Sequence, residues 1–67
     1  MKNYVERMVV ELNELSDRVE KLTKFFHTET FMGLPSKKRE LMERQFKAMV
    51  EYKEVLAERL EIEKSEE

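Results

Sequence analysis

The segment 41-LMERQFKAMVEYKEVLAERLEI-62 contains two apolar stripes, and each follows heptad spacing. The first stripe consists of Met42, Phe46, Met49, Leu56 and Leu60, and the second stripe consists of Leu41, Ala48, Tyr52, Val55 and Ile62. A partner helix within the same chain can cover one stripe, but the other needs a second chain. The spacing therefore predicts a long amphipathic helix in a protein that forms oligomers.

A seam of the same kind runs along the N-terminal part of the chain. Its members alternate steps of three and four residues: Val5, Met8, Leu12, Leu15, Val19, Leu22 and Phe26. This spacing predicts a helix over residues 3–27, in which Asn3 and Glu6 have the spacing of a capping box. Val9 and Val10 lie off the seam, so we expect them to contribute to the oligomer interface.

Residues 28–35 are predicted to connect two helices. Thr28 can cap a single helical turn, Gly33 can end it in a left-handed conformation, and Pro35 prevents helix continuation. Ser36 is then expected as the N-cap of a second helix over residues 36–64. The apolar residues of the connection are expected to plug the end of the core: Phe31, Met32 and Leu34.

A short connection between two long helices forces them to lie antiparallel. The expected fold is therefore all-α: a coiled-coil-like antiparallel two-helix hairpin, one domain over residues 1–67, that assembles into a homo-oligomeric helical bundle. Pairing Leu22 with Phe46 places Met8 beside Leu60 and Lys53 on the seam. The Lys53 stem can pack there while its ammonium group reaches water, and it can influence the specificity of assembly.

The composition excludes several classes of function. The chain has no Cys, which excludes disulfides and thiolate metal sites, and its net charge of −2 argues against binding duplex nucleic acid. No apolar run approaches the length of a transmembrane helix, and the N-terminus does not read as a signal peptide. We therefore expect a cytoplasmic protein that does not associate with membranes.

The sequence offers no constellation for catalysis. His27 is the sole histidine, and its predicted place at a helix end favours an interaction with the helix dipole. The serines lack a plausible base, no Glu-x-x-His pair suggests a carboxylate metal site, and there is no glycine-rich phosphate loop. We expect no enzymatic activity, no metal and no cofactor.

Three polar or aromatic residues spaced by sevens share the face of the second stripe: Gln45, Tyr52 and Arg59. Arg59 can form a fork onto a phosphate, Tyr52 can stack on a ring, and Gln45 can read a base edge. Tyr4 and Arg7 are further candidates for ligand contact, although Tyr4 can equally cover the core. The alternative is an oligomer interface without a ligand, because Tyr and Arg are enriched at such interfaces.

The first helix carries additional positive charge. Arg18 and Lys24 each follow a glutamate by four residues, so the pairs Glu14–Arg18 and Glu20–Lys24 are expected on its surface. Lys21, between Arg18 and Lys24 in the sequence, is a further cation on this stretch.

The run 21-KLTKFF-26 leads to further landmarks in a fixed order: Thr28, Phe31, Leu34, Leu41, Gln45, Ala48-Met49, Tyr52, Leu56 and Arg59-Leu60. In this order the chain resembles a family of small helical-hairpin proteins of tailed bacteriophages. By architecture it is also similar to the anti-CBASS phage proteins, which assemble into hexamers and hold cyclic nucleotide immune signals in pockets between protomers. We carry over none of their ligand-contacting residues to this chain, and the candidates named above rest on spacing alone.

The resemblance implies a phage anti-defence protein that acts in the cytoplasm of the infected bacterial host. Its partners would be other copies of itself, as in a hexamer, and a nucleotide second messenger of the cyclic-oligonucleotide or cyclic-ADP-ribose type. Two alternatives of other classes stay open: a helical module that binds and inhibits a host protein, and a structural or assembly subunit of the virion.

Overall fold

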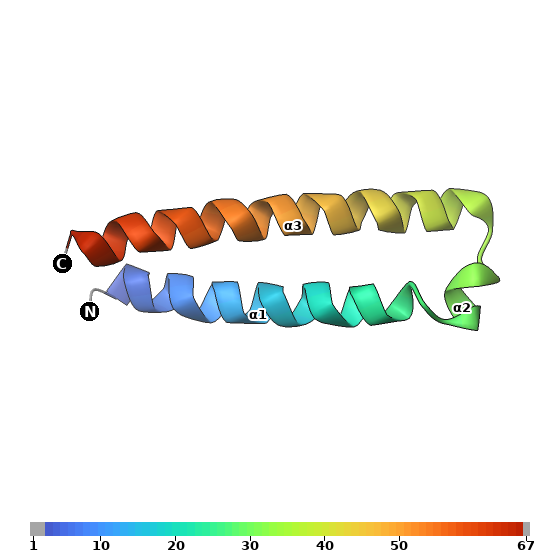
Figure 1. The fold of residues 1–67 in the computed structure, drawn as a ribbon, viewed down its shortest axis with the longest axis horizontal. Coiled ribbons are helices and arrows are strands. Elements are labelled where there is room, and N and C mark those ends of the chain that lie inside the picture. Colours follow the sequence, from blue (N-terminus) through green and yellow to red (C-terminus); the bar gives the residue numbers. More distant parts are fainter. Residues whose placement is uncertain (1–2, 67) are drawn as a thin grey trace.

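The computed structural model describes residues 3–66, which form three helices: α1 (Asn3–Phe25), α2 (Glu29–Met32) and α3 (Ser36–Ser65). Figure 1 shows α1 and α3 lying side by side in opposite directions, with the single turn of α2 at the connection. Within residues 3–66 there is no strand, which confirms the expected all-helical hairpin. Helix α1 ends at Phe25, two residues before the predicted boundary.

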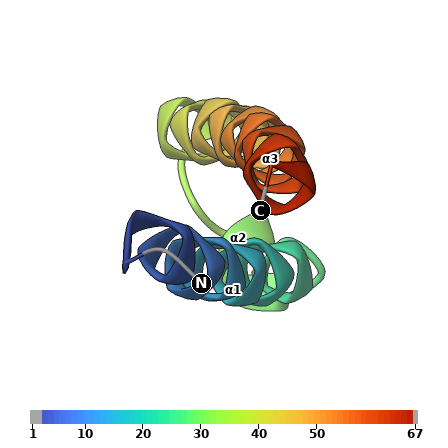
Figure 2. The same ribbon diagram turned by 90° about the vertical axis from the view of Figure 1, so that its left-hand side faces the viewer.

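The molecule is a rod with principal extents of 49 × 15 × 14 Å. Its radius of gyration is 15.2 Å, whereas a compact domain of this length would have a value of about 11 Å. Viewed along the rod, α1 and α3 form a single two-helix layer, so each helix keeps an uncovered outer side (Figure 2). The accessible surface is 5328 Å², compared with about 4,500 Å² for a compact monomer of this mass.

The hairpin core lies between α1 and the first stripe of α3. Val5, Met8, Leu56 and Leu60 form one buried cluster, which confirms the predicted neighbourhood of Met8 and Leu60. Val9 packs partly against this cluster, and its expected contribution to the oligomer interface stays a prediction.

Aromatic rings close the core at the connection. Phe31 is only 6% exposed, and its ring centroid lies 4.8 Å from that of Phe26 and 6.0 Å from that of Phe25. Phe26 also packs on Phe46 with a centroid distance of 5.3 Å. The predicted Leu22–Phe46 pairing stays a prediction; Leu22 is half-buried one turn before Phe26, on the same seam of α1.

The other two residues of the predicted plug are less enclosed than Phe31. Met32 is 65% exposed, so its assignment to the plug was wrong, and Leu34 is half-buried. Helix α2 is only four residues long, and a single turn can direct one large side chain inward while the next one points to solvent.

Hydrogen bonds of the connection explain where each helix starts. The Thr28 hydroxyl accepts a hydrogen bond from the backbone N–H of Phe31 (3.2 Å), which confirms Thr28 as the cap of the single turn. Gly33 has φ −83° and ψ −5°, so the predicted left-handed stop was wrong. Its backbone N–H donates to the Glu29 carbonyl (2.9 Å), which continues a right-handed turn until Pro35 interrupts it.

Ser36 is the first residue of α3 rather than its N-cap, so that prediction was wrong. Pro35 occupies the cap position with φ −57° and ψ 148°, and no side chain caps the helix. Arg39 binds the connection instead, because its Nε donates to the Leu34 carbonyl (3.1 Å) and its backbone N–H donates to the Pro35 carbonyl (3.1 Å). The predicted Asn3–Glu6 capping box stays a prediction, because its flanking residues lie outside the described range.

Candidate binding and assembly surface

The second stripe of α3 lies on the surface of the hairpin. Four of its side chains are between 45% and 57% exposed: Leu41, Tyr52, Val55 and Ile62. Ala48 is also exposed, and on α1 Val10 is 55% exposed. These α3 residues form an apolar track at heptad spacing that stays about half exposed in the hairpin. The coverage of this track by a second chain stays a prediction.

Tyr52 connects the exposed track to α1. Its hydroxyl donates a hydrogen bond to the Glu11 carboxylate. This hydrogen bond is the main reason why the pKa of Tyr52 is raised. Desolvation and the negative charge of Glu11 raise the pKa further, while the positive charge of Arg59 lowers it. Tyr52 therefore carries a protonated hydroxyl at neutral pH, and Arg59 is close enough to influence it. The sequence pattern did not identify Glu11, because the contact depends on how the two helices are aligned.

Gln45 lines an open depression of about 340 Å³ between the helices, together with Arg18, Lys21, Leu22 and Met49. The Gln45 amide reaches only the sulfur of Met49, at 3.9 Å. A volume of this size lies at the low end of the range for ligand sites, so the depression alone would enclose a nucleotide poorly. Its lining combines cationic, amide and apolar groups, which is the chemistry that a phosphate joined to a base requires.

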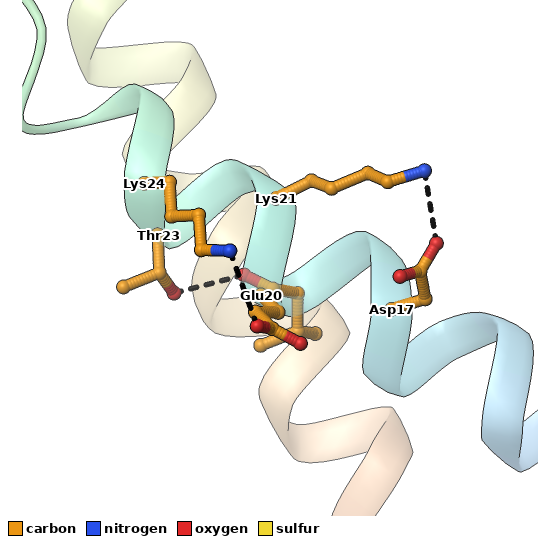
Figure 3. Close-up of polar contacts among 6 residues, drawn as sticks. Asp17, Glu20, Lys21, Thr23 and Lys24 are labelled. Carbon is orange, nitrogen blue, oxygen red and sulfur yellow. Dashed lines mark hydrogen bonds and ion pairs between the residues drawn. The ribbon is translucent and has the colours of Figure 1, made fainter.

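The cations on the second half of α1 differ in whether they have an ion-pair partner. Lys21 pairs with Asp17 (3.0 Å), and Lys24 pairs with Glu20 (3.3 Å) (Figure 3). The Thr23 hydroxyl donates to the backbone carbonyl of Val19, one turn earlier on α1. The Glu20–Lys24 prediction is confirmed. The Glu14–Arg18 prediction was wrong, since among residues 3–66 Arg18 has no ion-pair partner.

Tyr4 and Arg7 lie at the opposite end of the hairpin from Gln45. The Tyr4 hydroxyl donates to the Glu63 carboxylate (2.6 Å), so Tyr4 links the start of α1 to the end of α3. Arg7 is exposed one turn further along α1. Both residues belong to a different part of the rod from the Arg18–Gln45 depression.

A single hairpin does not bring the predicted ligand residues together. Gln45 and Arg59 are two heptads apart on the same helix, which corresponds to about 21 Å along its axis. Tyr52 lies midway between them. One small ligand could therefore touch at most two of these three side chains in one chain.

Other chemistry is sparse in the described part of the chain. Residues 3–66 contain no group of three or more His, Cys, Asp or Glu side chains that could hold a metal ion. His27 is exposed beyond the end of α1. No helix among these residues is both long and apolar enough to cross a membrane. The exposed face of α3 and the adjoining depression together present aromatic, apolar and cationic groups.

The fold defines a small helical hairpin with an exposed, largely apolar face along one side. A family model described as Sequestin matches residues 2–62, so the chain belongs to the Sequestin family. No curated protein and no solved structure gives a match. The family's name suggests that its members sequester a molecule.

Proposed function

We propose that this protein is a phage anti-defence protein that sequesters a nucleotide-derived immune signal without cleaving it. The signal is a cyclic oligonucleotide or a cyclic-ADP-ribose-type molecule, held in pockets between the subunits of a homo-oligomer in the cytoplasm of the infected bacterial host. The observation that carries this proposal is the match to the Sequestin family over residues 2–62.

The chemistry of the α3 face supports a nucleotide as the ligand. The Arg59 guanidinium can form paired hydrogen bonds with a phosphate, the Tyr52 ring offers a stacking surface, and the Gln45 amide can both donate to and accept from a base edge. Arg18, which has no ion-pair partner within residues 3–66, adds a second cation near Gln45.

Sequestration in this form is stoichiometric. The protein removes the free signal by mass action and keeps it from its effector, so its effect depends on the concentration of binding sites and on the dissociation constant. An acidic chain can still hold an anion when several subunits direct their cations into one pocket, since the local field and not the net charge governs binding there.

The test starts with a thermal-shift screen of the wild-type protein against cyclic dinucleotides, cyclic trinucleotides and cyclic-ADP-ribose-type signals. A molecule that raises the melting temperature is then titrated calorimetrically into the wild type, Arg59→Ala and Lys47→Ala. Lys47 is the matched control, because it is an exposed cation on another side of α3. The loss of one charge-assisted hydrogen bond costs about 1.5–3 kcal/mol, so Arg59→Ala should bind roughly 10- to 150-fold more weakly.

Light scattering on the same samples separates ligand contact from assembly. The proposal requires Arg59→Ala to stay assembled while it binds more weakly, with the ligand recovered intact after denaturation of the complex. An assembled wild-type protein that binds no member of the panel would contradict the proposal and would favour a module that binds a host protein through its exposed apolar track.

A further inference from the structure

The charges of the hairpin are separated along the rod. Residues 17–47, which form the half with the connection, contain eight Lys or Arg and five Asp or Glu, for a net charge of +3. The remaining residues, 1–16 and 48–67, contain five Lys or Arg and ten Asp or Glu, for a net charge of −5. Two parallel copies would place like charges together at both ends, whereas two antiparallel copies place each basic half beside an acidic half.

The exposed track of α3 has the symmetry that an antiparallel contact needs. Together with Gln45 and Arg59 its residues alternate steps of four and three from Leu41 to Ile62, with Tyr52 near the centre. When two such tracks meet about a two-fold axis near Tyr52, the Leu41 end of each copy lies beside the Ile62 end of the other. Both ends of the track are then covered by the same contact.

We propose that a second copy of this chain packs antiparallel on the exposed α3 track, and that each binding pocket combines the Arg18–Gln45 depression of one copy with Arg59 of the other. This inference deepens the proposed function and rests on it for the ligand, but not for the packing. It also explains why Gln45 and Arg59, about 21 Å apart in one chain, share a face. In the antiparallel pair they come within about one helical turn of each other.

The composite pocket has an electrostatic reason to hold an anion. Lys21 is neutralised by Asp17, but neither Arg18 nor Arg59 has an ion-pair partner within residues 3–66. Two guanidinium groups that converge beside the Gln45 amide repel each other unless a phosphate lies between them. By symmetry the pair of chains contains two such pockets, one on each side of Tyr52.

Charged residues that flank the track favour the same orientation. Arg44 and Glu58 lie on the same side of the track, and both are exposed without an ion-pair partner in residues 3–66. The antiparallel contact places Arg44 of each copy near Glu58 of the other, which gives two attractive charge pairs. The opposing repulsion comes from one contact, between the two Glu51 side chains at the two-fold axis.

Cross-linking determines the orientation without any ligand. The wild-type chain has no Cys, so Leu41→Cys and Ile62→Cys each introduce one thiol at an exposed end of the track. These positions are about 32 Å apart along α3. The variants are refolded separately and as a mixture, and then treated with a short bismaleimide. The antiparallel contact predicts covalent dimers only in the mixture, together with efficient dimer formation by the double variant Leu41→Cys/Ile62→Cys.

Glu43→Cys and Glu61→Cys form the matched control, since they lie at similar heights on the opposite side of α3 and should give no dimer. Dimers formed by Leu41→Cys alone and by Ile62→Cys alone would show a parallel contact and overturn the inference, while the proposed function could still hold. Conversely, cross-links in the mixture from a protein that binds no signal would uphold the packing and contradict the proposed function.

A charge exchange provides an independent check. Arg44→Glu should weaken association measurably at low salt, and Arg44→Glu/Glu58→Arg should restore it, because the exchange recreates both pairs with reversed direction. An exchange variant that associates no better than Arg44→Glu would contradict the antiparallel placement of these residues.

Discussion

At the scale of single residues, Phe31 is the buried side chain of the connection, and we expect it to contribute strongly to stability. Its ring lies between Phe25 and Phe26 and is 6% exposed. Phe31→Ala should destabilise the protein by about 3–5 kcal/mol, since it removes a buried ring and leaves a cavity. This is comparable to the whole stability that a core of this size supplies. Urea denaturation followed by circular dichroism measures the change.

Met32→Ala is the control for this prediction, because the neighbouring side chain is 65% exposed. Its effect should lie within about 0.5 kcal/mol. A similar loss in the two variants would mean that the connection is stabilised by its backbone rather than by the ring of Phe31.

Tyr52 should titrate above the ordinary tyrosine pKa of about 10. Its hydrogen bond to Glu11 is the largest cause, and this bond stabilises the protonated hydroxyl. An acid whose pKa is raised on folding contributes stability that is complete below its unfolded pKa and is lost as the pH rises through the folded pKa. The stabilisation from this contact should therefore disappear only in the alkaline range.

Tyrosinate absorbance in a Tyr4→Phe background reports Tyr52 alone, since the chain has two tyrosines. Adding Glu11→Gln should lower the pKa of Tyr52 towards its ordinary value, whereas Glu14→Gln, one turn away on α1, should leave it unchanged. An unaltered titration in Glu11→Gln would exclude Glu11 as the cause.

At the scale of the elements, the end of α2 tolerates a side chain at Gly33. The residue has right-handed backbone angles, and a Cβ atom there would meet the Glu29 and Thr30 carbonyl oxygens at 3.5 and 3.7 Å, which are ordinary contact distances. Gly33→Ala should therefore stabilise the protein by about 0.4–1 kcal/mol, because alanine restricts the unfolded chain more than glycine does. A lower melting temperature in a thermal scan would contradict the right-handed turn.

Lys53 tests whether the seam of α3 needs a polar residue. It is half-buried among the apolar side chains of the first stripe and has no ion-pair partner within residues 3–66. Lys53→Leu should keep or raise the melting temperature, and native mass spectrometry then shows whether the number of subunits changes. A much lower melting temperature with unchanged assembly would show that the ammonium group makes a specific stabilising contact.

At the scale of the whole molecule, the exposed track predicts a multimer at micromolar concentration. Val55→Glu should dissociate it, because the new carboxylate would be buried without a partner in the contact between copies. Lys47→Glu introduces the same residue on another side of α3 and should leave the assembly intact. Light scattering that gives a folded species of 8.2 kDa for the wild type would contradict the prediction.

By itself, the sequence determined the two long helices, their antiparallel order and the stripe of α3 that faces α1. Heptad periodicity is a local property, and a short connection leaves few ways to arrange two helices. It also identified Thr28 as a cap, because that signal depends on residues three positions apart.

Only the tertiary structure decided how the helices meet near the connection and which residues form the depression. Phe46 packs on Phe26, Tyr52 binds Glu11, and Arg18 and Gln45 line one hollow, although each pair is far apart in the chain. Such contacts depend on the relative shift of two helices. A heptad pattern predicts which apolar side chains meet across the seam, but contacts beside the seam depend on the exact rotation and shift of the two helices, which only the folded structure fixes.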